Sequence, residues 1–499
     1  MVRSLAVNAE GTPTKGVEPK NDFQILSRND LQRIHLASLS VLEDVGVAVY
    51  DNQCLDLLSR SGATINEKTK TALIPEHLVD EAVRSTPSRI HLHARNPKYD
   101  LRLEGKEVHF VARGPNVPKI IDIDSGVRRD PTDRDVELLA RLADGLENIH
   151  AYGGITTTTD VPAKLADVHR FAIAFNNTEK VVFDGAPGKV NAQAFVKMAA
   201  AVVGSLEELR SKPLIAGFGC PVAPLQHPAD SLDWLVEFAK NKLPYCVLSE
   251  PMGGASAPVT LAGGLVVMNA EILSGIVIAQ LVNRGTPIIY GATPFPINMK
   301  TGSLLAGTPE VGLTSAVSAQ LAQYYGIPSF TECTPDTKVI DAQAVFEAAP
   351  IFAPAMTGCN LIGIAGTMES GLTASFEQMV LADEFAGLIY RLMQGLELTE
   401  ETLAVDAIKN VGAGGHFLSS PHTMKHAIRE LWYPKLIDRQ SLGKWKEAGA
   451  KTMEQRANER AKEILRTHIP PPLERSVQNE ILAVQKETEA LLLKKSVKS

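Results

Sequence analysis

Short apolar runs alternate with longer amphipathic segments over most of the chain from residue 149 onward. The short runs are rich in β-branched and aromatic residues and end in glycine, proline or polar residues, which is typical of buried strands. The segments between them are long enough for helices. This alternation predicts a parallel sheet with crossover helices, so the expected fold class is α/β. The predicted strands are 149–156, 180–184, 213–218, 244–249, 286–290, 328–331 and 360–365.

Helix-start signals fall between these strands, as the alternation requires. Thr308 precedes Pro309, which places a capping residue before a proline at the first helical position. Thr132 and Asp135 have the spacing of a capping box, and apolar residues follow them at helical intervals. The agreement between strand and helix signals strengthens the prediction of repeated βα units.

Seven clear βα repeats, with a weaker eighth strand near 411–418, fit a TIM (β/α)8 barrel better than a doubly wound sheet of about five or six strands. The glycines of 411–418 also suit a loop. The first residues differ, because two predicted helices precede short alternating strands, one of them at 108–112. We therefore divide the chain into an N-terminal α+β extension (1–125), a barrel domain (126–440) and a helical C-terminal tail (441–499).

Composition narrows the class of protein. The net charge of −7 and the pI near 6.0 give no basic excess for binding phosphates, so we expect no nucleic-acid partner. The apolar segment 261–282 is long enough to cross a membrane, but Asn269, Glu271 and several glycines interrupt it, which favours a buried helix. Five cysteines without a CxxC pair, and residues 1–18 without the apolar core of a signal peptide, indicate a reducing, cytoplasmic location and no membrane.

The chemistry of a TIM barrel lies where its strands end, so the residues just after the predicted strands are the candidates. The segment 285–390 contains no arginine and two lysines, Lys300 and Lys338, against nine acidic residues. A site bordered by these loops attracts cations and repels phosphates, although single acids on helices can simply face water. The candidates are Thr157, Asp184, Cys220, Glu250, Thr293, Phe295, Glu332, Cys333, 335–343, Thr367, Glu369 and, if the eighth strand forms, His416 and Phe417.

Two features have metal-ligand character, and both lack a complete set of ligands. His91 and His93 are two residues apart on a predicted strand and share a face, but nothing nearby in the sequence completes the set, so we interpret them as a surface pair. Cys333, beside Glu332, could be a zinc ligand or a nucleophile, yet no histidine motif accompanies it. We therefore predict no metal site.

Four parts of the chain have the character of family signatures: 110–115 with 122–126, 250–255, 335–347 and 362–370. They resemble the trimethylamine methyltransferase family, whose barrel enzymes pass a methyl group from an amine to a corrinoid protein. The resemblance covers nearly the whole chain. Founding members carry pyrrolysine in or near the segment that corresponds to 334–343, whereas this chain has only standard residues there.

The absence of pyrrolysine bears on the substrate. In the family that residue is thought to capture and activate a neutral methylamine, so a member without it needs a substrate that is already activated. The resemblance therefore implies a quaternary amine such as glycine betaine, whose leaving group departs as a neutral tertiary amine. It also implies attack by Co(I) of a cognate corrinoid protein, so that the partner supplies the corrinoid and no cofactor is bound tightly. By the same analogy, and from an apolar stripe in the tail, we expect a homo-oligomer.

For this reaction we assign roles to the candidates. The positive charge of an onium ion disappears in the transition state, so aromatic or polar walls serve catalysis better than direct carboxylates. Phe295, His416 and Phe417 are therefore expected to surround the cation. No general acid is needed. The residues expected to act catalytically, by orienting the substrate or the loops, are Glu250, Asp341, Gln343 and Glu369.

A substrate carboxylate would need a cationic or amide partner. Lys338, Arg113 or backbone amides are the candidates, and Glu332 joins Lys338 among the expected substrate-binding residues. Two other functions stay open. A lyase or hydrolase would use Glu332 or Glu369 as a base and turn over without a corrinoid partner. A non-catalytic homologue would bind quaternary amines and leave Co(I) unmethylated.

Overall fold

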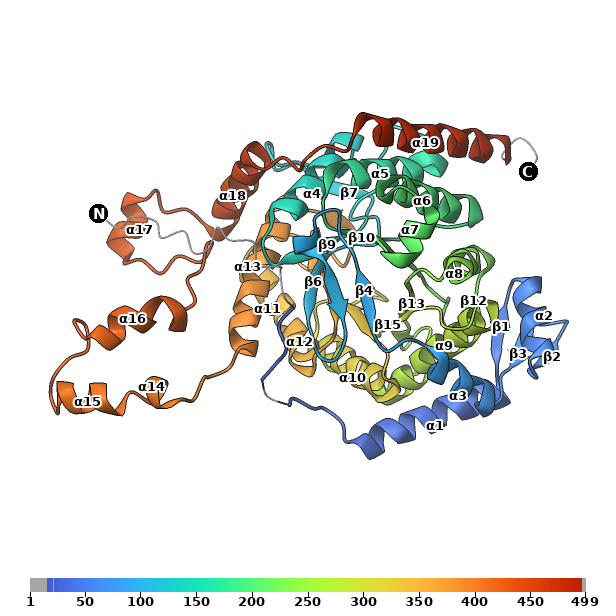
Figure 1. The fold of residues 1–499 in the computed structure, drawn as a ribbon, viewed down its shortest axis with the longest axis horizontal. Coiled ribbons are helices and arrows are strands. Elements are labelled where there is room, and N and C mark those ends of the chain that lie inside the picture. The colour runs from blue at the N-terminus through green and yellow to red at the C-terminus, as the bar shows by residue number, and fades with distance from the viewer. Residues whose placement is uncertain (1–15, 21, 496–499) are drawn as a thin grey trace.

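Eight parallel strands close into a barrel at the centre of the molecule (Figure 1). The computed structural model describes residues 16–20 and 22–495. The ring closes because its first strand, at 109–112, pairs in parallel with both the second and the last strand of the barrel. The predicted TIM-barrel class is therefore confirmed. In chain order the strands are β6 (His109–Ala112), β9 (Ile149–Tyr152), β10 (Val181–Asp184), β11 (Ile215–Gly219), β13 (Tyr245–Ser249), β15 (Ile288–Ala292), β17 (Ser329–Glu332) and β18 (Leu361–Ala365).

The strand that completes the barrel is β6, so the prediction of an eighth strand near 411–418 is wrong. That segment holds the end of a helix and a loop. The pairing that closes the ring joins segments far apart in the sequence, such as His109 and Leu361, and no local pattern reveals it. The neighbouring short strands also make 108–112 look like part of an antiparallel sheet. The first barrel strand thus lies within 1–125, and the three-part division of the chain stays a prediction.

Helices follow the strands and form the outer layer of the barrel (Figure 1). Their inner faces are buried, and the aromatic rings of Phe171, Phe195 and Trp234 pack between three neighbouring helices with centroids 4.8–6.0 Å apart. Such packing supplies much of the burial that stabilises the ring. The helices are α4 (Asp133–Gly145), α5 (Ala163–Asn177), α6 (Lys189–Val203), α7 (Leu206–Ser211), α8 (Ala229–Asn241), α9 (Leu261–Val282), α10 (Pro309–Tyr325), α11 (Ala342–Ala348), α12 (Phe352–Thr357) and α13 (Phe376–Met393).

The apolar helix α9 is a core helix of the barrel. It is the one described helix with the length and composition to cross a membrane, and most of it is buried inside the protein. Its polar residues have internal partners: Asn269 donates to Ser38 Oγ at 2.9 Å and accepts from Tyr290 OH at 2.8 Å, and Glu271 accepts from Ser249 Oγ at 2.6 Å. These hydrogen bonds allow polar groups to lie in an apolar helix at little cost.

The start of α4 offers a local test of the fold. Thr132 accepts from the backbone of Asp135, and the Asp135 carboxylate accepts from the Thr132 N–H at 2.8 Å, so the predicted capping box is confirmed. We expect Thr132→Ala to lower the free energy of unfolding by about 1 kcal/mol, measured by chemical denaturation. Thr260, the N-cap of α9, is exposed and makes no side-chain cap hydrogen bond. Thr260→Ala is therefore the control, and an equal loss in both variants would contradict the capping argument.

The N-terminal segment packs against one side of the barrel. Helices α1 (Arg28–Asp44), α2 (Asn52–Arg60) and α3 (Glu76–Ser85) contact α9. Three short strands, β1 (Val47–Val49), β2 (Thr64–Asn66) and β3 (Thr71–Leu73), form a small sheet with β12 (Gln226–His227) from the barrel region. This α+β arrangement agrees with the predicted character of the segment, of which residues 1–15 lie outside the described part.

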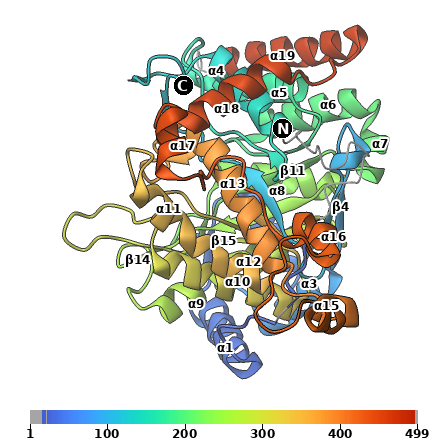
Figure 2. The ribbon, with the colours of Figure 1, turned by 90° about the vertical axis from the view of Figure 1, so that its left-hand side faces the viewer.

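An antiparallel hairpin covers the amino-terminal end of the barrel. It consists of β4 (Ile90–Leu92) and β5 (Leu101–Leu103), with Ile90 opposite Leu103. The four apolar side chains of the hairpin are buried in one cluster with interior residues of the barrel strands, such as Val181 and Ala216. In Figure 2, β4 lies on one side of the barrel, whereas α11 and the rim strand β14 (Met252–Gly253) lie on the other.

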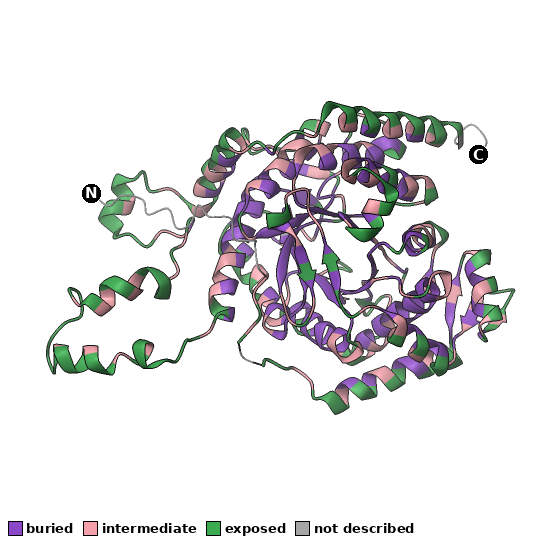
Figure 3. Cartoon of the chain, viewed as in Figure 1, coloured by how far each residue is buried: buried purple, intermediate pink, exposed green. Residues whose placement is uncertain are grey.

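An arm extends away from the barrel after α13 (Figure 1). We use this name for residues 396–450, which contain four short helices in which no residue is buried, and Figure 3 shows the segment as largely exposed. The chain then returns through α18 (Met453–Thr467), which contacts α4 and α13, and α19 (Arg475–Lys495), which contacts α5 and α6. The helices of the arm are α14 (Glu400–Leu403), α15 (Val405–Val411), α16 (Pro421–Glu430) and α17 (Leu442–Glu447).

Candidate active site

Two carboxylates and one guanidinium meet at the carboxyl-terminal mouth of the barrel. Arg113 follows β6, Glu250 follows β13 and Glu332 ends β17, so three strands deliver them to the same end of the ring. Arg113 forms an ion pair with Glu332, in which the arginine side chain is 3% exposed and the glutamate side chain 12%. Glu250 lies near enough to both for their charges to act on its pKa.

The electrostatics of these three groups are unequal. Burial, followed by the nearby charge of Glu332, raises the pKa of Glu250 to about 8, although Arg113 opposes the shift. Glu250 is therefore mainly protonated at neutral pH, while Arg113 and Glu332 neutralise each other. The mouth thus carries little net charge near pH 7 and gains one negative charge as the pH rises through 8.

Three phenylalanine rings surround the guanidinium of Arg113. Its Cζ lies 3.9 Å from the centroid of Phe218, 5.2 Å from that of Phe330 and 5.7 Å from that of Phe183. Phe183 and Phe330 are buried, whereas Phe218 is only half-buried at the end of β11. The aromatic faces hold the guanidinium in place, and Phe218 offers an aromatic surface where the mouth meets solvent.

The cysteines near the mouth are neutral thiols. Cys220 Sγ lies 3.9 Å from Glu250 Oε2, and burial, reinforced by the nearby carboxylates, raises the pKa of the Cys220 thiol well above its usual range. Burial also raises the pKa of Cys333 to about 12, and its Sγ contacts the carbonyl oxygens of Ala306 and Glu347. Neither thiol has the thiolate character of a nucleophile. No group of three His, Cys, Asp or Glu side chains with the spacing of a metal site lies at the mouth among the described residues.

A second buried ion pair supports the neighbouring strand ends. Arg170 of α5 pairs with Asp184 at the end of β10 and donates to the carbonyl oxygen of Gly185 at 3.3 Å. Gly154, after β9, lies so close to Arg170 that an added Cβ would stand 2.3 Å from the guanidinium. Only glycine fits there without moving the arginine. This pair therefore holds the ends of β9 and β10 in place at the mouth.

The comparisons with known proteins agree with this geometry. A family model described as Trimethylamine methyltransferase (MTTB) matches residues 4–490. The chain belongs to the trimethylamine methyltransferase family. It is 39% identical to the trimethylamine methyltransferase MttB of Desulfitobacterium hafniense strain DCB-2. The alignment of 465 residues covers 93% of each chain. It is 33% identical to the glycine betaine methyltransferase of Desulfitobacterium hafniense strain Y51, over 92% of this chain and 96% of the other.

A solved structure of a related enzyme confirms the fold. The monomethylamine methyltransferase MtmB of Methanosarcina barkeri aligns with a TM-score of 0.54 over 95% of this chain and 90% of its own, at 11% identity. At that identity the likeness supports the barrel alone. Family membership makes the chain a methyltransferase enzyme, and corrinoid-dependent methyl transfer is the role of this family. In TIM-barrel enzymes the active site lies at the carboxyl-terminal mouth.

Glu369, one of the residues predicted to act catalytically, lies at the rim of the mouth. Glu369 pairs with Arg128 at 3.0 Å, and its N–H donates to the carbonyl oxygen of Thr337 at 2.9 Å. A hydrogen bond from Thr373, reinforced by Arg128, lowers the pKa of Glu369. Glu369 has a φ of +57° in the left-handed region, so the turn is held by its surroundings. It ties the loop after β17 to the small sheet of β7 (Lys119–Ile121), β8 (Arg128–Arg129), β19 (Thr367–Met368) and β20 (Thr373–Ala374).

Other predicted residues have local structural contacts on this rim. Asp341 is the N-cap of α11 and accepts from the N–H of Gln343 at 2.8 Å, while the Gln343 side chain donates to Glu347 at 2.6 Å. Lys338 is exposed and donates to the carbonyl oxygen of Asp336. Phe295 lies in β16 (Phe295–Pro296), which pairs with β14 just after Glu250. Their assigned roles in the reaction stay predictions.

His416 and Phe417 are not brought to the mouth. Both are exposed residues of the arm, in the loop between α15 and α16, and Figure 2 shows these helices away from β14 and α11 at the rim. Their nomination depended on a barrel strand at 411–418, which does not form. In this chain alone they cannot surround a cation at the barrel mouth.

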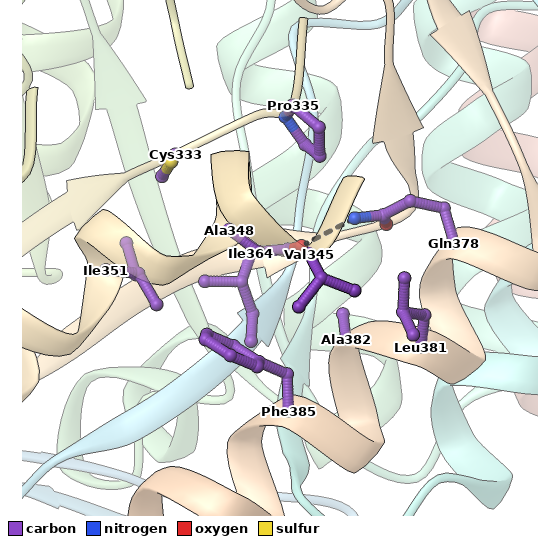
Figure 4. A pocket seen from close by; sticks show the side chains of 10 residues that line it. All are labelled: Cys333, Pro335, Val345, Ala348, Ile351, Ile364, Gln378, Leu381, Ala382 and Phe385. Carbon is purple, nitrogen blue, oxygen red and sulfur yellow. Dashed lines mark hydrogen bonds between the residues drawn. The ribbon is translucent and has the colours of Figure 1, made fainter. Parts of the chain in front are cut away.

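An apolar pocket lies beside the rim, outside the barrel (Figure 4). Its volume is about 30 Å³, far below the roughly 150 Å³ of an apolar cavity that takes up benzene. Gln378 donates to the carbonyl oxygen of Ile364 at 3.5 Å across one side of it. Such a volume is a gap in packing between α11 and α13 and is too small for an amine substrate. The lining residues are Cys333, Pro335, Val345, Ala348, Ile351, Ile364, Gln378, Leu381, Ala382 and Phe385.

Arg113 was predicted only as a possible partner for a substrate carboxylate, and the three phenylalanines around it were not predicted as site residues. Arg113 stands directly after β6, as Glu250 stands after β13, but assigning 108–112 to the extension hid its position at a strand end. The rings of Phe183, Phe218 and Phe330 lie within strands that were predicted as strands. Their direction toward a common guanidinium depends on the register of the closed barrel, which the sequence does not reveal.

Proposed function

We propose that the enzyme transfers a methyl group from a quaternary amine of the glycine betaine type to Co(I) of a cognate corrinoid protein. The observation that carries this proposal is the meeting of Glu250 and Glu332 with a single guanidinium at the barrel mouth. One protonated carboxyl group, one carboxylate and one guanidinium leave the mouth without an excess of positive charge that would repel an onium ion. A site for an anionic substrate would need the opposite balance of charge.

The near-neutral state of the mouth suits the reaction. The positive charge of the substrate nitrogen and the electron-rich Co(I) both disappear as the new bond forms, so tight ionic binding of the ground state would slow the chemistry. The ion pair with Arg113 weakens the attraction of Glu332, and protonation weakens that of Glu250 near pH 7. The half-buried ring of Phe218 adds a cation–π surface that orients the onium ion without a full opposing charge.

The atoms and electrons of this transfer balance without a proton. The lone pair of Co(I) attacks the methyl carbon, the carbon–nitrogen bond breaks with its pair moving to nitrogen, and methyl-Co(III) and a neutral tertiary amine result. The protein's tasks are orientation and exclusion of water. This fits a mouth with two neutral thiols and a carboxyl group that is mainly protonated at neutral pH.

A betaine carboxylate requires a cation at the mouth, and Arg113 is better placed for it than Lys338. Arg113 lies directly beside Glu332 and Glu250, whereas the Lys338 ammonium is exposed and bound to a backbone oxygen of its own loop. We infer that the substrate carboxylate competes with Glu332 for the Arg113 guanidinium. A quaternary amine without a carboxylate lacks this contact.

Single-turnover spectroscopy tests the function. The enzyme is mixed with a reduced corrinoid protein and one amine at a time, and loss of the Co(I) absorbance is followed. We expect loss with a quaternary amine and none with trimethylamine. Loss with trimethylamine would contradict the quaternary preference, and unchanged Co(I) with every amine would favour the non-catalytic homologue. Product formation by the enzyme alone would favour a lyase or hydrolase.

We propose that the corrinoid is bound by the partner protein, that the enzyme holds no tightly bound cofactor of its own, and that it works in the cytoplasm. Cytoplasmic residence is supported by the free state of all five cysteines. It is also supported by the burial of α9 within the barrel. Absorbance spectra of the purified protein test the cofactor proposal, since a bound corrinoid would give visible bands.

We propose that the arm binds a second copy of this chain. Three apolar side chains of the arm are left open to solvent within one chain. Leu403 is 50% exposed, Ile408 55% and Met424 75%. Contacts between α14 and α16, such as His426 with Glu401 at 3.2 Å, are polar. Analytical ultracentrifugation of Leu403→Ser/Ile408→Ser is expected to show a smaller assembly than the unchanged protein. A monomeric unchanged protein, or an unaltered assembly in the variant, would contradict this.

A further inference from the structure

We propose that His91, His93 and Asp100 form a binding site for a divalent transition-metal ion at the amino-terminal end of the barrel. The donor atoms of the three side chains all lie within 4.8 Å of one another. The site lies on the hairpin, at the opposite end of the ring from the mouth, and it takes no part in the methyl-transfer reaction.

The hairpin brings a third ligand that the sequence order conceals. His91 lies in β4 and His93 just after it, two residues apart and so on one face, and Asp100 lies just before β5 on the antiparallel partner. Asp100 Oδ2 is 3.2 Å from His93 Nδ1 and 3.6 Å from His91 Nε2. The imidazole centroids are 4.0 Å apart. Two imidazoles and one carboxylate converge as the ligands of zinc and related ions do.

The surrounding contacts hold these groups in place before any ion binds. The hairpin's other face is anchored by buried leucine and isoleucine side chains in the barrel interior. The N–H of His93 donates to Pro213 O at 2.8 Å, ahead of β11. The other carboxylate oxygen of Asp100 accepts from the N–H of Ala94 at 2.9 Å, which leaves Oδ2 for an ion. A rigid framework lowers the entropic cost of assembling the ligands.

Charged side chains and solvent both border the site. Arg102 lies opposite His91 in the strand register, and its positive charge repels a cation, while the negative charge of Glu104 attracts one. His91 and His93 keep side-chain exposures of 45% and 26%. Solvent therefore reaches the site, and water completes the coordination of an ion held by three protein ligands.

Direct titration tests the site. Full-length protein is dialysed against a chelator and titrated with Zn²⁺ by calorimetry, and with Co²⁺ by visible spectroscopy, which reports nitrogen and oxygen ligation. We expect one saturable equivalent per chain and a rise in melting temperature with Zn²⁺. Asp100→Asn keeps a side-chain oxygen for the N–H of Ala94, so the hairpin should stay folded. It and His93→Ala are expected to weaken Zn²⁺ affinity by roughly tenfold or more, since even outer contacts of metal ligands are worth that much.

The arm supplies a matched control. His422 and His426 lie one turn apart on α16 with ring centroids 4.4 Å apart, so they are a second histidine pair that could attract the same ions. His422→Ala/His426→Ala should keep the equivalent of Zn²⁺ that Asp100→Asn loses. The proposal is overturned if no saturable equivalent exists, if Asp100→Asn and His93→Ala bind Zn²⁺ as tightly as the unchanged protein, or if only the arm variant loses binding.

Discussion

A Glu332→Gln variant is expected to lose about 3–5 kcal/mol of its free energy of unfolding, because Arg113 would be left in the interior without its ion partner. The guanidinium is 3% exposed and enclosed by aromatic rings that cannot replace a carboxylate. Chemical denaturation followed by circular dichroism measures the loss. Methyl transfer should fall as well, since the position of Arg113 depends on the pair.

A double variant separates the cost of the unpaired charge from the value of the pair. Arg113→Met/Glu332→Gln removes both charges and fills a similar volume, so it should recover most of the lost stability. It should not recover methyl transfer, because the mouth then lacks its ionic groups. Equal stability of Glu332→Gln and the unchanged protein would contradict the ion pair described here.

A Glu250→Gln variant is expected to become more stable relative to the unchanged protein as the pH rises. The folded protein holds a proton on Glu250 up to about pH 8, whereas the unfolded chain releases it near the ordinary value of 4.5. The native state therefore binds more protons between these pH values, and its stability falls through that window. Glutamine escapes this loss, so the difference between the two proteins should grow by a few kcal/mol from pH 5 to pH 9.

Unfolding free energies at pH 5 and pH 9 check this expectation. Glu207, exposed at the start of α7, supplies the control, because Glu207→Gln should show no comparable change with pH. Binding of the amine should follow the same group. Above pH 8 the Glu250 carboxylate attracts the onium ion, so the unchanged protein should bind it more tightly there than at pH 6. A constant difference in stability across the pH range would contradict the raised pKa.

The sequence predicted the barrel because its signals are local. Periodicity, capping residues and strand-sized apolar runs are read within a few residues of each other, and seven of the eight barrel strands lie where those signals place them. Ring closure is not local, since β6 meets β18 only after the whole chain has folded. The strand at 108–112 was therefore predicted but assigned to the extension, and this hid the position of Arg113 at the mouth.

The same distinction explains the candidate site. Glu250 and Glu332 were predicted to lie at strand ends and are found together, because the position of each follows from its own strand. His416 and Phe417 depended on a strand that does not form. Asp100 was not associated with His91 and His93, because antiparallel pairing, and not sequence spacing, brings it beside them.

The most direct test of the central claim is where the amine binds. Isothermal titration at pH 9 compares binding of the active quaternary amine to the unchanged protein, to Glu250→Gln and to His416→Ala/Phe417→Ala. We expect roughly tenfold weaker binding to Glu250→Gln, from the loss of one opposing charge at the mouth. Binding to the arm variant should be unchanged. Full affinity in Glu250→Gln together with lost affinity in the arm variant would contradict a substrate site at the barrel mouth.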